Sequence, residues 1–276
     1  MYHLFRFTTM GAPDTLDIAS LFQGSPSTGE GMVINSSGDF ILCGTQQNEI
    51  GAARYTSAGN VIFQKTSGGS EGGHAVTFDP ISAYILTAGE QSGDFRIRRY
   101  TVTGGQSGVQ RIDFYGGDDA ALAITTYPAS SANFAGRIVA VGNVESQTQG
   151  ENIGVVRIIS PANGGAMDGT FDSDGKLDID LFGGNEKATG VAVQTDDKIV
   201  VSARVVNGPT TYLAVLRFNS NGTLDTSFDG DGYVLVNCNS CASAGNVSIQ
   251  ADGRIVAVGT SGNGSAADFL VVRIWP

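Results

Sequence analysis

The sequence predicts an all-β fold and favours a β-propeller of five four-stranded blades in one ring. Three observations lead to it: a unit that recurs every 45 to 60 residues, short apolar runs separated by glycine-rich turns, and no stretch with the period and caps of a helix. A six-bladed ring, or part of a longer array of the same unit, is the alternative.

The composition is that of a folded chain with many tight turns. Of 276 residues, 41% are hydrophobic and 16% are charged, which is enough apolar material for a core. Glycine occurs 39 times, about twice the usual ~7%. Glycine adopts positive φ angles without steric cost, so it is the natural residue for short turns between strands.

The repeat is marked by two patterns in each unit. The first is an apolar run that ends at a small residue, as in 138–142 (IVAVG), 199–203 (IVVSA) and 255–259 (IVAVG). The second is an arginine before a large apolar residue, which follows a polar loop. These arginines are Arg54, Arg99, Arg157, Arg217 and Arg273, with an additional copy at Arg6.

Each unit reads as four strands, here named A to D. Strand A is rich in small residues, strand B is the apolar run, strand C carries the arginine and strand D precedes the next unit. Because strand B is apolar at consecutive positions, both of its faces are expected to be buried. Units of this kind at this spacing are typical of propeller blades. The expected blades are 28–64, 72–114, 119–181, 188–237 and 244–274, with an extra strand at 3–7.

Ring closure is less determined than the repeat. The last unit ends at strand C, and strand 15–20 is expected to supply its missing strand D and so remove a free edge. The extra strand 3–7 then has no evident place. It leaves three possibilities open: a position beside the closure, a place in a longer array of the same unit, or a sixth blade completed by another chain.

Residues 224–232 (LDTSFDGDG), 250–259 (QADGRIVAVG) and 268–273 (DFLVVR) resemble the delta-60 repeat, a bacterial β-propeller repeat family of unknown function. The third unit carries a related segment at 167–175 (MDGTFDSDG). The resemblance extends over nearly the whole chain and is closest in the last three units. It implies a propeller fold and a secreted, periplasmic or cell-surface location, but no reaction.

Charge narrows the classes of partner. The net charge is −11, which disfavours nucleic acid and anionic membrane surfaces, since both need a basic face. No apolar run approaches the ~20 residues of a membrane span. Residues 1–9 do not form a signal peptide, so the extracytoplasmic expectation rests on the resemblance.

The loops between strands B and C are the expected binding surface. They are rich in amides and acids, and loops on a rigid scaffold commonly carry binding sites. Such side chains suit sugar hydroxyls, cations or a protein partner, although a solvated acidic rim is the simpler interpretation. The candidate ligand-binding residues are Gln46, Gln47, Glu49, Glu90, Asp94, Glu145, Glu151 and Asn152, together with His74 near the axis.

Two aspartate-rich turns are candidate calcium sites. Asp172, Asp174 and Asp178 lie in one turn, and Asp229 and Asp231 in the corresponding turn of the next unit. Calcium prefers several oxygen ligands from such loops. Neither turn completes an EF-hand, and the alternative is a side-chain-capped turn that begins strand D. No other cofactor is expected.

Cysteines and arginines complete the candidates. Cys43 lies in an apolar run and is expected to be buried, whereas Cys238 and Cys241 could form a local disulfide or remain thiols. The recurring arginines are expected to bond a carboxylate or carbonyl groups of a neighbouring blade, and a ring of ligand-binding arginines is the alternative.

The sequence therefore predicts a non-enzymatic binding or scaffold propeller that recognises a protein or glycan on its B–C loop face. A glycosidase-type or lyase-type propeller that uses channel carboxylates is one alternative. A structural subunit of a larger assembly is another.

Overall fold

The computed structural model describes residues 2–7, 13–21, 27–68, 71–146, 150–159, 165–237, 243–262 and 267–275. Within these residues the chain forms strands and turns and no helix. The described residues thus contain no helix of the length and apolarity needed to cross a membrane.

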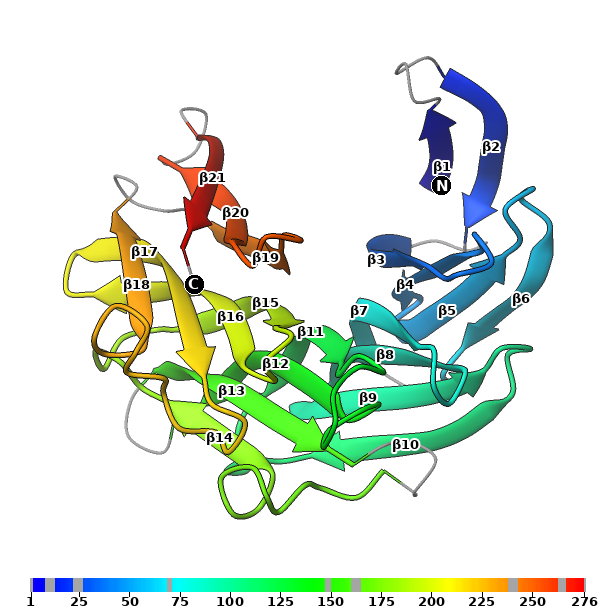
Figure 1. The fold of residues 1–276 in the computed structure, drawn as a ribbon. Helices are drawn as coiled ribbons and strands as arrows, with labels where there is room; N and C mark the ends of the chain where they lie inside the picture. Colours follow the sequence, from blue (N-terminus) through cyan, green and yellow to red (C-terminus); the bar gives the residue numbers. More distant parts are fainter. Residues whose placement is uncertain are drawn as a thin grey trace.

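Four antiparallel four-stranded sheets and one three-stranded sheet follow one another around an arc (Figure 1). In each sheet the strands lie side by side in chain order. The first three sheets comprise β3 (Ser27–Ile34), β4 (Phe40–Gln46), β5 (Glu49–Tyr55) and β6 (Val61–Thr66); β7 (Glu71–Asp79), β8 (Tyr84–Gln91), β9 (Asp94–Thr101) and β10 (Gln106–Ile112); and β11 (Ala120–Thr126), β12 (Ile138–Glu145), β13 (Glu151–Ile158) and β14 (Lys176–Ile179). The fourth comprises β15 (Lys187–Val193), β16 (Ile199–Asn207), β17 (Thr210–Phe218) and β18 (Tyr233–Asn237), and the fifth comprises β19 (Ser243–Ile249), β20 (Ile255–Ser261) and β21 (Asp268–Ile274).

Within each sheet the strands follow the order A, B, C and D of the predicted unit, and the sheets are here called blades. The A strands of successive blades contact one another, as expected for the inner edge of a propeller. The B strands of the first four blades are buried on both faces, and in β12 every residue except the last is buried. The all-β, propeller-like architecture predicted from the repeat is therefore confirmed.

The hydrophobic core lies between blades. One cluster joins Val139 and Val155 of the third blade to Val201 and Leu216 of the fourth. Similar clusters join the first blade to the second, the second to the third and the fourth to the fifth. Because each blade is buried by its neighbours, a blade at the end of the series has one face without this cover.

The N-terminal strands differ from the expected closure. β2 (Pro13–Leu21) pairs with β1 (Tyr2–Phe7) as an antiparallel hairpin, and the fifth sheet retains three strands. Pairing two strands that are adjacent in the chain closes only a short loop, which costs less entropy than recruiting β2 across the molecule. In Figure 1 the arc is open between β19–β21 and the β1–β2 hairpin.

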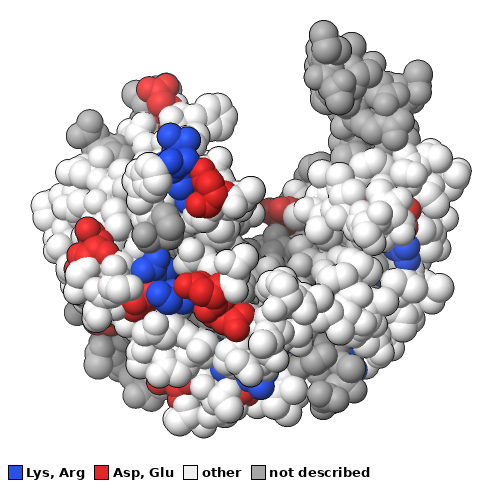
Figure 2. All heavy atoms as spheres, in the orientation of Figure 1, with Lys and Arg blue, Asp and Glu red and all other residues white. Residues whose placement is uncertain are grey.

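Charged side chains on the face shown in Figure 2 gather over the third to fifth blades. Most Lys and Arg side chains in this view lie beside Asp or Glu. The first two blades show few charges on the same face. The view thus presents mixed charge and not a patch of one sign.

Candidate functional site

A pocket of about 820 Å³ lies at the inner ends of the first four blades and is here called the axial pocket. It is built from A strands, the ends of B strands and the loops that adjoin them. Its lining residues are Thr28, Thr45, Asn48, Gly72, His74, Glu90, Ser92, Gly93, Asp118, Ala120, Leu122, Asn143, Glu151 and Lys187.

The same position of the repeat lines this pocket in successive blades. Where strand A begins and strand B ends, one residue of each strand faces the other in the antiparallel register. These cross-strand pairs are Thr28 with Thr45, Gly72 with Glu90, and Ala120 with Asn143, and in the fourth blade Lys187 pairs with Arg204. The propeller thus presents one structurally equivalent pair per blade, and its chemistry changes from blade to blade.

A β-bulge in each A strand adds further side chains to the site. The register shifts between Gly73 and Ala75 in β7, which leaves His74 without a cross-strand partner. An equivalent shift between Ala121 and Ala123 in β11 leaves Leu122 unpaired. A bulge changes the direction of the side chain at the extra residue. Both His74 and Leu122 line the axial pocket.

Asn143 and Glu151 form a fixed polar unit in the pocket. The Nδ2 of Asn143 donates a hydrogen bond of 2.8 Å to Oε1 of Glu151. A carboxylate accepts only from a donor, so this bond also fixes the orientation of the amide. Asn143 is 6% exposed, and its Oδ1 has no hydrogen-bond partner. The pocket therefore contains a buried acceptor that no described protein group satisfies.

The electrostatics of the pocket centre on His74. Burial lowers the pKa of His74, and Lys187 lowers it further, whereas Glu90 and Glu30 oppose the shift. The net pKa lies below the ordinary value of about 6.5. At pH 7 the imidazole is therefore neutral and has one donor and one acceptor nitrogen.

The structure brings together three of the nine predicted ligand-binding residues, namely His74, Glu90 and Glu151. Gln46, Gln47 and Glu49 form the turn between β4 and β5, but Asn48 is the residue of this turn that lines the pocket. Glu145 does not line the pocket, but its carboxylate accepts a hydrogen bond of 2.9 Å from the backbone N–H of Asp118, which does.

The side chains of Asp94 and Asn152 bond to neighbouring strands of their own blades. Asp94 is buried and forms an ion pair with Arg111 of the neighbouring strand β10. Asn152 is 5% exposed, and its Nδ2 donates a hydrogen bond of 3.1 Å to Oδ2 of Asp178. Neither residue lines the axial pocket, so these two polar side chains hold strands of their own blades together.

Two of the pocket residues that the sequence prediction missed, Thr45 and Asn143, share a detectable signal. Like the predicted Glu90, each directly follows the glycine that ends an apolar B run. Aligning the units on that glycine would have placed Thr45 and Asn143 at the same position of the repeat as Glu90. Asp118 follows a glycine pair that was interpreted only as a turn, and Lys187 begins its A strand.

The aspartate-rich turns have the geometry of capped turns. Oδ1 of Asp174 accepts a hydrogen bond of 2.8 Å from the N–H of Lys176, and Oδ1 of Asp231 accepts one of 3.1 Å from Tyr233. Asp172 and Asp229 adopt positive φ angles of 45° and 52°. Asp172, Asp174 and Asp178 line a small pocket together with Lys176. Over the residues that the structure describes, no group of three or more His, Cys, Asp or Glu is arranged to hold a metal ion.

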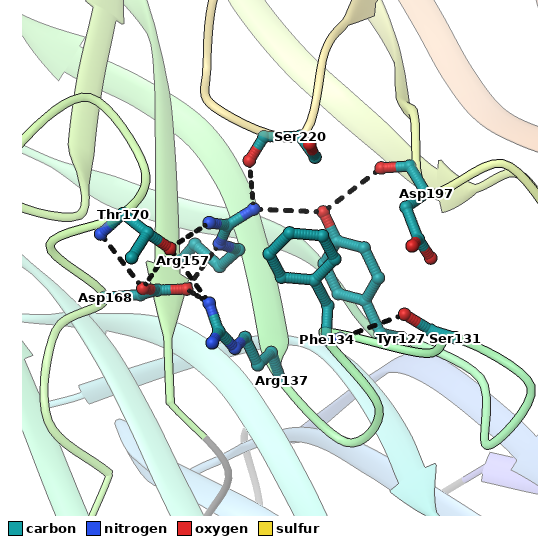
Figure 3. Close-up of polar contacts among 9 residues, drawn as sticks. All are labelled: Tyr127, Ser131, Phe134, Arg137, Arg157, Asp168, Thr170, Asp197 and Ser220. Atoms are coloured by element: carbon teal, nitrogen blue, oxygen red, sulfur yellow. Dashed lines mark hydrogen bonds and ion pairs between the residues drawn. The ribbon is translucent and has the colours of Figure 1, made fainter.

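Two of the recurring arginines, Arg54 and Arg157, connect successive blades, as Figure 3 shows for Arg157. The buried Arg157 donates from Nε to Oδ2 of Asp168 at 2.7 Å and from a terminal nitrogen to the carbonyl of Ser220 in the fourth blade. Arg54 repeats the arrangement with Asp39 in its own blade and with the carbonyl of Val102 in the second blade, at 2.8 Å. The carbonyl partner is in the next blade, as expected, but the carboxylate belongs to the same blade.

Arg217 has an equivalent partner in Asp225, with an Nε to Oδ2 distance of 2.6 Å. Burial alone would raise the pKa of Asp225, but hydrogen bonds from Lys198, Ser227 and Arg217 outweigh it and hold that pKa well below its usual range. Arg217 and Asp225 thus form an ion pair in which both groups stay charged, and this pair connects strand C to the loop that leads to strand D.

The cysteines contribute no described site. Cys43 is a buried free thiol, and burial raises its pKa above the ordinary value, so it is an unreactive core residue. The proposed disulfide between Cys238 and Cys241 lies outside the described residues.

Comparison with known proteins supports the fold. The family described as "Domain of unknown function (DUF5122) beta-propeller" matches residues 194–228 and 250–276. A search of curated protein sequences found no match.

Among solved structures, hydrazine synthase from Kuenenia stuttgartiensis is similar with a TM-score of 0.58 and 10% identity, over 91% of this chain and 68% of that one. The Dos1 propeller gives a TM-score of 0.52 and 8% identity, over 92% of this chain and 55% of its own, so this chain spans only about half of that protein. A chain of the nidogen–laminin complex gives a TM-score of 0.50 and 10% identity, over 84% of this chain and 72% of that one. At such identities the likeness concerns the fold alone, and these findings together identify the chain as similar to β-propeller repeat proteins.

Proposed function

We propose that this chain is a non-enzymatic binding propeller that recognises a hydroxyl-rich ligand, a glycan, in the axial pocket. The observation that carries the proposal is the unsatisfied Oδ1 of Asn143. A buried acceptor without a partner costs about 1–3 kcal/mol. A ligand hydroxyl that donates to this oxygen would remove that cost.

The rest of the pocket supports a ligand with several donors. Glu90, Asp118 and Glu151 supply carboxylate acceptors, and the hydroxyls of Thr28 and Ser92 can accept or donate. The volume of about 820 Å³ falls in the usual range of small-molecule sites. Sugar hydroxyls both donate and accept, so they match a lining in which acceptors outnumber donors.

A glycosidase-type or lyase-type enzyme is the second candidate, and one observation favours it. His74, which is neutral at pH 7, lines the same pocket as the carboxylic acids Glu90 and Glu151. A neutral histidine can act as a general base, and paired carboxylates are the usual groups of glycoside hydrolysis. This candidate predicts turnover of the bound glycan, whereas the binding propeller predicts none.

The compartment and partners follow from the same proposal. A propeller that binds a glycan would act in a secreted, periplasmic or cell-surface setting, as the delta-60 resemblance suggests. The net charge of −11 supports a neutral or basic partner and disfavours nucleic acid.

Two asparagines provide a matched test. Asn143 and Asn152 are both buried and both donate from Nδ2 to a carboxylate, but only Asn143 lines the axial pocket. The wild-type chain is screened on a glycan array, and the affinity for the best glycan is measured by calorimetry. We expect Asn143→Ala to weaken binding about 10- to 100-fold, and Asn152→Ala to leave it within about twofold.

Three results would count against the binding proposal. One is an array on which no glycan binds, and another is an equal loss of affinity in both variants. The third is conversion of the bound glycan to products, which would establish the enzyme instead. Circular dichroism of both variants checks that each one folds.

A further inference from the structure

The last blade exposes an apolar face that the other blades bury. On β21, Phe269 is 96% exposed and Val271 is 64% exposed, and on β20 Val258 is 38% exposed. Val258 lies opposite Val271, and Thr260 opposite Phe269, so these four residues share one side of the sheet, here called the end face. The opposite side packs against the fourth blade through Ile255 and Ala257.

The equivalent residues of another blade are buried between blades, which indicates what kind of surface fits the end face. When the C strands are aligned on their arginines, Phe269 and Val271 correspond to Ile153 and Val155 of the third blade, and both of these are fully buried. The fourth blade covers them, since Val155 shares a hydrophobic cluster with Val191 and Val201. The end face therefore has the chemistry of an interface between blades, and a β-sheet is the surface that fits it.

The β1–β2 hairpin has the features of the missing neighbour. Its first strand, β1, carries Arg6 followed by Phe7, and an arginine followed by a large apolar residue marks strand C in each of the five blades. β1 also pairs antiparallel with β2, as strand C pairs with strand D. β2 leads along the chain to β3, so the hairpin occupies the position before the first blade. Figure 1 shows it bordering the opening in the arc, with the last blade on the other side.

We propose that the end face is the docking surface for the chain's own β1–β2 hairpin, which stacks there as the outer half of a sixth blade and closes the ring. β1, in the position of strand C, would cover β21, the strand with the more exposed residues. Tethering within one chain favours this occupant over a second copy at ordinary concentrations, because the effective concentration is high.

The proposal can be tested by hydrogen exchange, because an isolated two-stranded hairpin is only marginally stable in water. If the hairpin is docked, the amides of β1 and β2 should be protected at least ~10-fold over the unfolded chain. The double variant Phe269→Ser, Val271→Ser should remove that protection. Ile81→Ser is the matched control, since Ile81 is 49% exposed in the turn between β7 and β8, and it should leave β1–β2 protected.

The outcomes are distinct. Unprotected β1–β2 amides in the wild-type chain, or equal protection in all three proteins, would overturn the proposal. Light scattering on the same samples tests the other occupant: a mass that doubles with concentration in the wild type and not in the double variant would assign the end face to a second copy. Slow exchange in β12 and β13 verifies that the double variant folds. If the double variant does not fold, the single variant Val271→Ser is used in its place.

Discussion

At the scale of single residues, the arginine of strand C has the largest structural role. Arg157 is fully buried, donates to Asp168, Thr170, Tyr127 and the carbonyl of Ser220, and lies over the ring of Phe171. These contacts involve strand C, the loop that follows it and the next blade at once. The residue that best identifies the repeat is thus a structural one, which explains why it gives little information about a ligand.

Replacing this arginine should be strongly destabilising. Arg157→Met leaves the buried carboxylate of Asp168 with Arg137 as its remaining ionic partner. We expect a loss of about 3–5 kcal/mol in the free energy of unfolding, measured with urea, because the buried carboxylate loses one of its two ionic partners and the carbonyl of Ser220 loses its donor. Arg254→Met is the control, since its partner Asp252 is 49% exposed, and the loss there should stay within about 1 kcal/mol. Similar losses in both variants would contradict the structural role.

The carboxylate partners of these arginines should govern stability in acid. The pKa of Asp225 is depressed in the folded state, so its contribution is complete above the unfolded value of about 3.9 and is lost as the pH falls toward the folded pKa. The stability difference between wild type and Asp225→Asn should therefore be largest near pH 7 and shrink below about pH 4. Urea unfolding at a series of pH values measures it, and a difference independent of pH would refute the assignment.

At the scale of elements, the aspartate-rich turn before strand D shows that a sequence resembling a calcium-binding loop can have a structural role. The carboxylates of Asp174 and Asp231 each accept a backbone N–H two residues ahead, at the point where the D strand begins. Oδ1 of each aspartate is thus engaged in a local hydrogen bond. The aspartate-rich pattern is therefore compatible with a capped turn that begins a strand, which was the alternative to calcium.

Two measurements separate the turn from a calcium site. Asp174→Ala and Asp231→Ala should each cost about 1 kcal/mol through the lost hydrogen bond. Adding millimolar calcium, or removing it with a chelator, should leave the Tm of the wild type unchanged. A rise in Tm with calcium that disappears in the two variants would instead establish a metal site.

The elements also show how far the sequence could lead. Strand types, their order and the buried B strands were predictable, because hydrophobic runs such as 138–142 and the arginine spacing depend only on the repeat. The pocket was predictable only in part. His74, Glu90 and Glu151 were among the expected binding residues, whereas Asn143 reaches the pocket through a cross-strand pair with Ala120, which depends on register. Asp94 and Asn152 looked like free loop residues because their partners, Arg111 and Asp178, lie on neighbouring strands.

At the scale of the whole molecule, the fold is a series of sheets in which each blade is stabilised by its neighbours. The interblade clusters are the main hydrophobic core, so stability depends on contacts between consecutive blades, as in other repeat proteins. A functional site at the inner ends of the blades gains from this arrangement. Each blade fixes one cross-strand pair in place, and the pairs differ in chemistry without changing the scaffold.

This arrangement predicts a gradient of local stability along the chain. The B and C strands of the third and fourth blades (β12, β13, β16 and β17) are covered on both faces, whereas β21 has no fully buried residue and β20 alternates between buried and partly exposed positions. Amides open locally with a free energy that rises with the burial around them. Hydrogen exchange of the native chain should therefore be slowest in the third and fourth blades and at least ~10-fold faster in β20 and β21. Docking of the hairpin would narrow this difference without abolishing it, because the two strands of the hairpin cover only part of a three-stranded sheet. Uniform exchange across the five blades would show that the chain unfolds as a single unit, and nearest-neighbour burial would then not explain its stability.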